Sequence, residues 1–399
     1  MNQEIVIVGG ARTPFGKFGG GLKNFSATDL AVLAGKEALR RSDVKPEEID
    51  HVIFGNVIQS SIDAAYLARH VGLRCEVPIP VPAFIVNRLC ASGFQAIVHG
   101  AMEILNGDAD EVLVGGTESM STAPHNIYGA RWGLELGKGR LEDALWAALT
   151  DTYCGCPMAI TAEHLARQYE VTREDADEFA YRSQMLATRA YEEGRLQEEI
   201  VSVEVPGRKG TVSIAKDEHF RSDIDPEKMA RLSPVFLADG QVTAGNASGI
   251  CDGAAALVLT TAESARQRSV KPLGKLVAWA AKGVQPDLMG IGPAPATRAA
   301  LAKASLGLED MDLIEVNEAF ASQYVAVERE LGLPREKVNV NGGAIALGHP
   351  LGASGTRLVL TLLYELRRRN GKYGLATACV GGGQGMTVIV ESYGSDNEG

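Results

Sequence analysis

The chain has 399 residues, more than one ordinary hydrophobic core accommodates, so two or three domains are expected. Hydrophobic residues make up 45% of it and charged residues 22%, which is typical of a soluble globular protein. The formal net charge of −11 argues against a nucleic-acid partner, because binding to phosphates needs a basic surface.

Targeting segments are not evident in the sequence. Residues 1–4 lead directly into an apolar segment without a basic and hydrophobic leader, so we expect no signal peptide. The longest apolar runs are too short to cross a membrane. Six cysteines are scattered along a large chain rather than arranged as a disulfide scaffold. These features predict a cytoplasmic protein with free thiols.

Short β-branched runs alternate with helical stretches from the N-terminus onward, which is typical of α/β proteins. The pattern predicts strands at residues 5–8, 50–54 and 111–114, with helices at residues 27–41 and 94–105. The second helix follows the sequence Leu-Cys-Ala-Ser-Gly, and we expect it to end at an Asn-Gly pair.

The second half of the chain repeats landmarks of the first. Ala91-Ser92-Gly93 recurs 262 residues later as Ala353-Ser354-Gly355. Asp50, which precedes its strand, recurs at the same displacement as Asp312, before a strand at residues 313–316. We therefore predict two copies of one fold, paired as half-domains rather than stacked as a solenoid, whose repeats are roughly 20–50 residues long.

The closing strands of the two copies locate an insertion. They lie at residues 253–259 and 385–390, only 132 residues apart. The first copy therefore holds extra residues, including a Glu- and Arg-rich helical segment at 161–193 and a hairpin candidate at 206–210. The predicted domains are an N-terminal half (1–120, completed by 250–270), an inserted loop domain (121–249) and a C-terminal half (271–399).

One glycine-rich stretch, at residues 339–355, presents a single histidine. It predicts an apolar strand, a turn that carries His349 and the start of a helix. Glycines allow positive φ and close approach of the backbone to a ligand. A helix start directs unpaired N–H groups and a partial positive charge to the same place. We expect this stretch to handle an anion or a developing oxyanion.

Two cysteines are candidates for chemistry. Cys90 precedes a predicted helix start, where the helix dipole stabilises a thiolate. Cys379 ends a strand just before a turn with four glycines. Either residue could instead be a buried cysteine that packs as a small hydrophobe. Similarly, Asn317 follows the strand at 313–316 and could either face the same edge or cap a helix.

The internal repeat relates these candidates to one another. The displacement of 262 residues places Asn87 at the position of His349, and Cys90 at that of Gly352. If the copies pack about a pseudo-twofold axis, both turns converge at the carboxyl ends of the strands, where open α/β sheets bind ligands. Two thiols and an imidazole would then share one site.

Four motifs taken together resemble the thiolase family, and most closely its acetyl-CoA acetyltransferase branch. They are Asn-Arg-Leu-Cys-Ala-Ser-Gly at 87–93, Asn-Glu-Ala-Phe at 317–320, the glycine-rich block at 342–355 and Cys-Val-Gly-Gly-Gly-Gln-Gly at 379–385. The resemblance covers essentially the whole chain. It implies an α/β, thiolase-like, five-layered α-β-α-β-α fold of two similar halves with an inserted loop domain, and a homotetramer.

The resemblance also implies a reversible Claisen condensation of two acetyl-CoA molecules to acetoacetyl-CoA plus CoA. Cys90 matches the nucleophile that becomes acylated, and Cys379 matches the base that removes an α-proton from the second acetyl-CoA. His349 matches the residue that activates Cys90, and with a water held by Asn317 it forms an oxyanion hole. The N–H groups of Cys90 and Gly381 match a second one. No metal or redox cofactor is implied, and CoA is a cosubstrate.

Nine further residues fall, by the same resemblance, at positions that contact CoA or the acyl group: Ser248, Ala244, Arg221, Leu149, Met158, Phe236, Met289, Ala319 and Phe320. One departure leaves the acyl-chain preference open, because Pro157-Met158-Ala159 stands where acetoacetyl-forming members often have His-Met-Gly. A 3-ketoacyl-CoA thiolase for longer chains in fatty-acid β-oxidation is the alternative. A decarboxylating ketosynthase would need a histidine in place of Cys379, and a non-catalytic acyl-CoA-binding protein would not need all three reactive residues.

Overall fold

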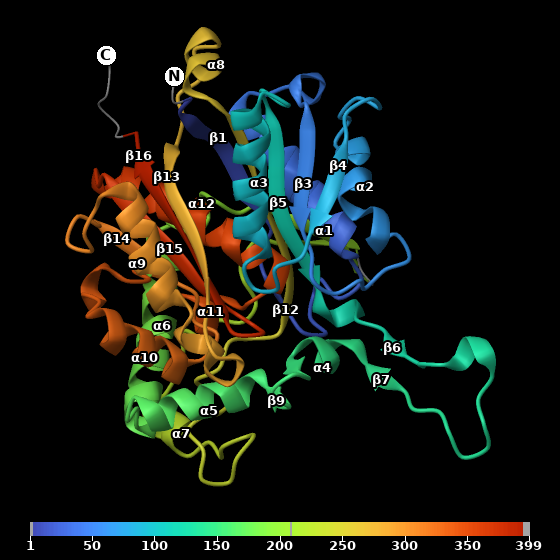
Figure 1. Ribbon diagram of the computed structural model, residues 1–399, viewed down its shortest axis with the longest axis vertical. Coiled ribbons are helices and arrows are strands. Elements are labelled where there is room, and N and C mark those ends of the chain that lie inside the picture. The colour runs from blue at the N-terminus through green and yellow to red at the C-terminus, as the bar shows by residue number, and fades with distance from the viewer. Residues whose placement is uncertain (1–2, 208–209, 394–399) are drawn as a thin grey trace.

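The computed structural model describes residues 3–207 and 210–393 and has the five predicted layers (Figure 1). Helices α1 (Ala27–Ser42) and α2 (Leu67–Arg74) cover the outer face of the first sheet. Helices α3 (Ser92–Asn106) and α12 (Leu351–Arg369) pack against each other in the centre. Helices α9 (Pro293–Ala304) and α10 (Ala321–Leu331) lie on the far side of the second sheet. The predicted α-β-α-β-α arrangement is confirmed.

The two halves share one strand order, as the repeat predicts. The N-terminal half has the order β1 (Ile5–Arg12), β12 (Cys251–Thr261), β5 (Val112–Ser119), β3 (His51–Gly55) and β4 (Ala83–Val86). The C-terminal half has β13 (Gly274–Gly283), β16 (Gln384–Ser392), β15 (Tyr373–Val380) and β14 (Leu313–Val316). The pairs β3–β5 and β14–β15 are parallel, and the others that match are antiparallel. Two residue pairs between β1 and β13 join the two sheets.

The repeated aspartates hold equivalent places. Asp50 Oδ2 accepts two backbone N–H groups, at 2.9 and 3.0 Å, just ahead of β5. Asp312 Oδ2 accepts two, at 2.7 and 3.0 Å, just ahead of β15. Each carboxylate therefore fixes the entry of the same strand in its own copy, which explains why the sequence repeats it.

The central helix α12 is buried at every position of its first three turns. Its sequence is apolar or small all round because it has a sheet on either side and α3 alongside. The one charged residue in this stretch, Arg357, is 0% exposed and pairs with Glu315 of β14 at 3.1 Å. Burial of these side chains forms the largest part of the core between the sheets.

The inserted segment contains short strands, helices and a hairpin. Its elements are β6 (His125–Asn126), β7 (Glu142–Asp143), α4 (Ala144–Ala148), β8 (Thr150–Asp151), β9 (Cys156–Pro157), α5 (Met158–Gln168), α6 (Arg173–Glu192), β10 (Val203–Gly207), β11 (Gly210–Ile214) and α7 (Pro226–Ala230). The predicted hairpin is confirmed by the pairing of β10 with β11, while the turn residues Arg208 and Lys209 lie outside the described residues.

The single helical segment predicted at residues 161–193 is wrong. Two helices, α5 and α6, occupy this region, because Glu170 takes a φ of 53° and ends the first of them. The Thr172 hydroxyl then caps α6, and the Asp175 carboxylate completes a capping box by accepting the Thr172 N–H at 2.9 Å. The sequence Thr-Arg-Glu-Asp carries that signal, so the break was predictable.

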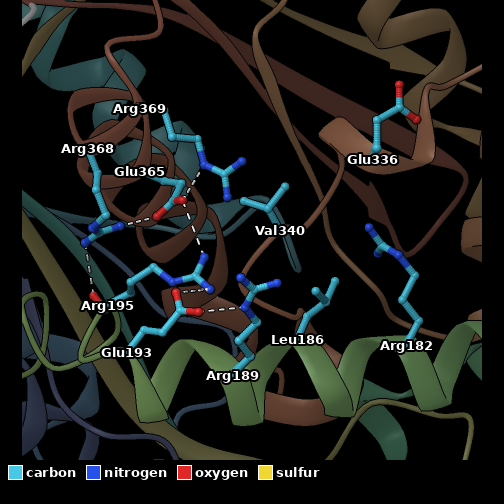
Figure 2. A pocket seen from close by; sticks show the side chains of 10 residues that line it. All are labelled: Arg182, Leu186, Arg189, Glu193, Arg195, Glu336, Val340, Glu365, Arg368 and Arg369. Atoms are coloured by element: carbon cyan, nitrogen blue, oxygen red, sulfur yellow. Dashed lines mark hydrogen bonds and ion pairs between the residues drawn. The ribbon is translucent and has the colours of Figure 1, made fainter.

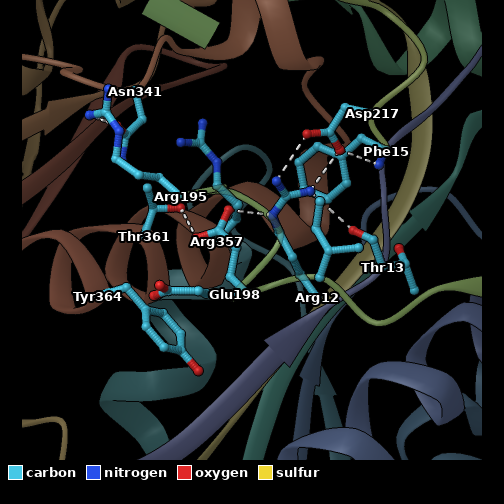
Figure 3. A network of polar contacts seen from close by, with 12 residues as sticks. Arg12, Thr13, Phe15, Arg195, Glu198, Asp217, Asn341, Arg357, Thr361 and Tyr364 are labelled. Carbon is cyan, nitrogen blue, oxygen red and sulfur yellow. Dashed lines mark hydrogen bonds and ion pairs between the residues drawn. The ribbon is translucent and has the colours of Figure 1, made fainter. Parts of the chain in front are cut away.

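A buried ion cluster ties the inserted segment to the first strand (Figure 3). Arg12, at the end of β1, is 0% exposed and pairs with Glu199 at 2.6 Å and with Asp217 at 2.7 Å. Asp217 also accepts from the Tyr191 hydroxyl at 2.7 Å. Because removing one partner of such a cluster leaves buried charges unpaired, the contact strongly fixes the insertion on the core.

The remaining elements are β2 (Gly16–Lys17), α8 (Ala262–Gln267) and the one-turn helix α11 (Ala344–Leu347). The strand predicted ahead of the glycine-rich turn is wrong, because Val338 and Val340 form only isolated bridges. The loop between β6 and β7 extends away from the body of the molecule (Figure 1). Across residues 3–207 and 210–393, no helix is both long enough and apolar enough to cross a membrane.

Candidate active site

The starts of the two central helices meet backbone to backbone. A Cβ atom added at Gly93 would lie 2.5 Å from the backbone nitrogen of Thr356. A Cβ added at Gly355 would lie 2.4 Å from the backbone nitrogen of Phe94. These contacts are related by the same displacement of 262 residues, so the two Ala-Ser-Gly copies pack symmetrically against each other. Only glycine allows this approach, and it brings together the turns that carry Cys90 and His349.

A strained turn presents Cys90. Leu89, just before it, has a φ of 47°, which is unusual for a side chain of this size. The Ser92 hydroxyl stabilises the turn, since its oxygen accepts the Arg88 N–H at 2.9 Å and its proton goes to the Leu89 carbonyl at 2.7 Å. Cys90 itself is partly exposed and stands just ahead of the first turn of α3.

Burial controls the protonation of Cys90. Desolvation raises the pKa of the thiol to about 11, and the nearby carboxyl of Glu118 acts in the same direction. Hydrogen bonds from the backbone N–H of Gly381 and from its own N–H act against this, but do not overcome it. Burial therefore opposes the stabilisation that the helix start is expected to give a Cys90 thiolate, and the role of Cys90 as nucleophile stays a prediction.

Cys379 lies beside Cys90. Burial raises the pKa of the Cys379 thiol, and the charge of a Cys90 thiolate raises it further. Cys379 is 0% exposed near the end of β15. The turn after it carries Gly381, whose α-carbon faces Leu89 and Met158. This turn therefore packs against the residue just before Cys90, while β15 holds the second thiol two residues ahead of Gly381.

Hydrogen bonds on both sides fix the His349 ring. Nδ1 lies 2.6 Å from the Ser354 hydroxyl, whose proton goes to the Pro350 carbonyl at 3.0 Å. The Ser354 oxygen therefore accepts from Nδ1–H, and Nε2 keeps its lone pair. Asn317 Nδ2 lies 3.3 Å from Nε2 and donates to it. Burial, and then the charge of Arg357, lower the pKa of His349 to about 3, so the ring is neutral.

Asn317 is delivered by β14 and does not cap a helix. Helix α10 begins at Ala321, and its N-cap is Phe320. The Asn317 N–H donates to the Thr377 carbonyl of β15 at 2.9 Å, so its side chain sits on the strand neighbouring the one that carries Cys379. Its Oδ1 is buried and has no hydrogen-bond partner among the residues that the structure describes.

The sequence did not single out Glu118, at the end of β5. Its buried carboxylate accepts from Asn56 Nδ2 at 3.1 Å and from the N–H groups of Val57, Ile58 and Gly352 at 3.2, 2.9 and 2.9 Å. Gly352 belongs to the first turn of α12, so one N–H of this helix start donates to a carboxylate of the protein and not to a ligand. For that N–H, the prediction that the helix directs free donors toward His349 is wrong. A single acidic residue at the end of an apolar strand was the only signal available.

Seven of the nine predicted CoA- and acyl-contacting residues gather around the two sulfurs. Met289 and Ala319 pack directly with Cys379, and this group is bordered by Met158 and Phe320. Leu149 belongs to the apolar cluster of Cys90, and its carbonyl accepts the Met158 N–H at 2.9 Å. The remaining two of the seven are connected through their neighbours: Ser248, whose N–H donates to the Ala319 carbonyl at 3.0 Å, and Phe236, which packs against the same apolar cluster as Phe320.

Two predicted residues lie farther from the sulfurs on the inserted segment. Ala244 and Arg221 are both exposed. The backbone N–H of Arg221 donates to Gln184 Oε1 of α6 at 2.8 Å, so its guanidinium is held on the insertion. Their assignment to CoA stays a prediction.

Comparison with known proteins identifies the class of protein that this fold and site define. Residues 5–263 match the thiolase N-terminal domain and residues 270–392 match the thiolase C-terminal domain. The chain therefore belongs to the thiolase family, whose members are acyltransferases.

Particular relatives are similar over nearly the full length. The human mitochondrial 3-ketoacyl-CoA thiolase is 51% identical, over 98% of this chain and 98% of the relative. An acetyl-CoA acetyltransferase of Syntrophomonas wolfei is 48% identical, over 98% and 100%. Among solved structures, the human enzyme superposes with a TM-score of 0.96 at 51% identity, over 98% and 99%. The Bacillus anthracis acetyl-CoA acetyltransferase also reaches 0.96, at 46% identity and the same coverage.

Proposed function

We propose that this chain is an acetyl-CoA C-acetyltransferase, which condenses two acetyl-CoA molecules reversibly to acetoacetyl-CoA and CoA. One observation supports the proposal: the turn of Gly381, just after Cys379, packs against Leu89, just before Cys90. The residues assigned as nucleophile, oxyanion donor and base therefore belong to two turns in contact. Relatives named acetyl-CoA acetyltransferase support this assignment.

In the first half-reaction, Cys90 Sγ attacks the thioester carbonyl of acetyl-CoA. Its proton passes to the lone pair of His349 Nε2, where it displaces the Asn317 amide donor, and then to the departing CoA sulfur. The thioester oxygen becomes an oxyanion, which the N–H groups of Cys90 and Gly381 stabilise.

In the second half-reaction, the Cys379 thiol gives its proton to His349 Nε2, and the thiolate so formed removes an α-proton from a second acetyl-CoA. His349 Nε2–H and a water held by Asn317 stabilise the enolate oxygen. The carbanion attacks the acetyl carbon, and as the new C–C bond forms the Cys90 sulfur leaves and takes the proton from His349 Nε2. The Ser354 oxygen accepts from Nδ1–H throughout, so the ring keeps a partner when Nε2 also carries a proton. The chemistry proposed needs CoA as cosubstrate and no other cofactor.

A 3-ketoacyl-CoA thiolase for longer chains is the second candidate. The 51% identity to the human enzyme of that name favours it. So does Pro157, which stands at the start of α5 in place of the expected imidazole, beside Met158 and the buried Ala159. Rates of CoA-dependent cleavage of 3-ketoacyl-CoA with four carbons against eight to sixteen distinguish the two. A maximum at the longer chains would replace the first proposal.

Separate half-reactions test the roles of the thiols. We expect Cys90→Ala to abolish incorporation of radiolabelled acetyl from acetyl-CoA. Cys379→Ala should still become acylated but should not condense. Cys75→Ala is the matched control, because Cys75 is also a buried free thiol but lies at the end of α2. Full condensation by the Cys379→Ala enzyme would contradict the assignment of the base.

We also propose a homotetramer in the cytoplasm. The loop between β6 and β7 exposes six large apolar side chains: Ile127, Tyr128, Trp132, Leu134, Leu136 and Leu141. Such an exposed apolar arm favours a subunit contact. The six free cysteines suit a reducing compartment, although the human relative is named mitochondrial. Light scattering should give four chains for the wild type and fewer for Trp132→Ser with Leu136→Ser, while Val212→Ser leaves the mass unchanged.

A further inference from the structure

A cavity of about 420 Å³ lies apart from the candidate active site and is lined by five arginines (Figure 2). Arg182 and Arg189 come from α6, and Arg195 follows that helix. Arg368 and Arg369 form the end of α12. No residue of the candidate active site lines it. A volume of this size is in the range of pockets that bind small molecules.

Guanidinium groups outnumber carboxylates around this arginine cavity. Its lining contains three glutamates, Glu193, Glu336 and Glu365, so its formal charge is positive in a chain of net charge −11. Glu193 is shared by Arg189 and Arg195, at 2.6 and 2.8 Å. Glu365 is shared by three arginines of the lining, Arg195, Arg368 and Arg369. Two carboxylates therefore serve four guanidinium groups, one of which also contacts Glu198 outside the lining.

Two arginine nitrogens at the cavity are buried without a partner. Arg195 has a side chain that is 8% exposed, and its Nε makes no hydrogen bond to any described residue. Arg182 donates through Nη2 to the carbonyls of Arg335 and Val338, at 2.6 and 2.9 Å, but its buried Nη1 has no partner in the described chain either. A buried donor left unsatisfied costs about 1–3 kcal/mol, and an anion in the cavity would recover part of that cost once these side chains turn toward it.

The helix dipole of α12 accounts for only part of this cluster of arginines. Basic residues at the end of the helix stabilise its dipole, which explains Arg368 and Arg369. It does not explain Arg182 or Arg195, which come from different elements and point into the same space (Figure 2). Arg189 and Arg369 each use Nε for their ion pair with a glutamate. The N–H groups of their terminal nitrogens can therefore donate to an acceptor in the cavity.

We propose that the arginine cavity is a binding site for a small molecule that carries two linked phosphates. Guanidinium forks bind phosphate oxygens in pairs, and their N–H groups converge here from three directions. A diphosphate offers acceptor oxygens at both of its ends, so it suits arginines that come from α6 and from the end of α12 better than a single phosphate does. The site is independent of the proposed condensation and gives the chain a second anion-binding surface.

Calorimetric titration with inorganic pyrophosphate tests the proposal on the full-length protein. We expect saturable binding with one site per chain, weakened about tenfold or more by Arg189→Gln combined with Arg369→Gln. The control is Arg40→Gln with Arg266→Gln, because these exposed arginines also pair with a glutamate on their own helices. Circular dichroism checks that both double variants remain folded. Inorganic phosphate should bind more weakly than pyrophosphate, which separates a diphosphate site from a general phosphate site.

A second titration uses the protein saturated with CoA. It is needed because CoA itself contains a diphosphate, so pyrophosphate could bind at the CoA site. We expect pyrophosphate to bind the CoA-loaded protein with unchanged affinity. Three results would overturn the proposal: no saturable binding by the wild type, equal weakening in both double variants, or displacement of pyrophosphate by CoA with the cavity variants unaffected.

Discussion

Replacing His349 by asparagine should remove a pH-dependent part of the free energy of unfolding. The buried ring has a pKa of about 3 against 6.5 for an ordinary histidine, so the unfolded chain binds a proton between these values and the folded chain does not. Stability from the neutral ring is therefore fully present above pH 6.5 and is lost as the pH falls toward 3. Between about pH 7 and pH 5 the loss is about 2 kcal/mol, since one pKa unit corresponds to about 1.4 kcal/mol.

Urea unfolding at the two pH values measures this difference. The wild type should lose about 2 kcal/mol more than His349→Asn over this interval. Other groups that titrate in it, such as Glu118 with its pKa raised to about 7, are present in both proteins and cancel. The exposed His125→Asn should behave as the wild type. Equal losses in the wild type and His349→Asn would refute the view that desolvation keeps this ring neutral.

Three further substitutions test contacts of the site. Gly381→Pro removes the N–H assigned to the oxyanion and should lower kcat about 100- to 1000-fold. Gly381→Ala keeps this N–H and should lower kcat only a few-fold, and steady-state kinetics measures both variants. Ser354→Ala removes the 2.6 Å partner of the His349 ring and should lower kcat about tenfold with KM little changed. Glu118→Gln places an amide donor against two N–H groups, so urea unfolding should show a loss of about 2–4 kcal/mol.

The repeat made much of the fold predictable from the sequence. Landmarks such as Asp50 and Asp312 recur because each one fixes the same strand entry, so their common displacement reports common architecture. Gly93 and Gly355 recur because each faces the backbone of the other copy. Residues with the same structural role in both halves recur in the sequence and can be recognised as a pattern. A residue whose role occurs in only one half leaves no such pattern.

The parts that were missed depend on contacts between distant segments. Glu118 accepts hydrogen bonds from the N–H groups of two segments separated by more than 290 residues. The local sequence of β5 contains no pattern that predicts these contacts. The effect of burial on the pKa of Cys90 was also not visible in the sequence. Its position at a helix start favours a thiolate, but the tertiary structure removes water from it, and desolvation is the larger effect. Sequence position gives the helix dipole, whereas burial is known only from the fold.

Close packing of the two helix starts accounts for both the convergence of the site and its neutral resting state. Gly93 and Gly355 allow the backbones to touch, which brings the turns of Cys90 and His349 together. Burial of these turns raises the pKa of the thiol and lowers that of the imidazole. A neutral thiol next to a neutral base does not form an ion pair until a thioester carbonyl accepts the developing charge. The proton transfer is therefore coupled to the attack on substrate, and the glycines that build the fold also determine when the nucleophile becomes reactive.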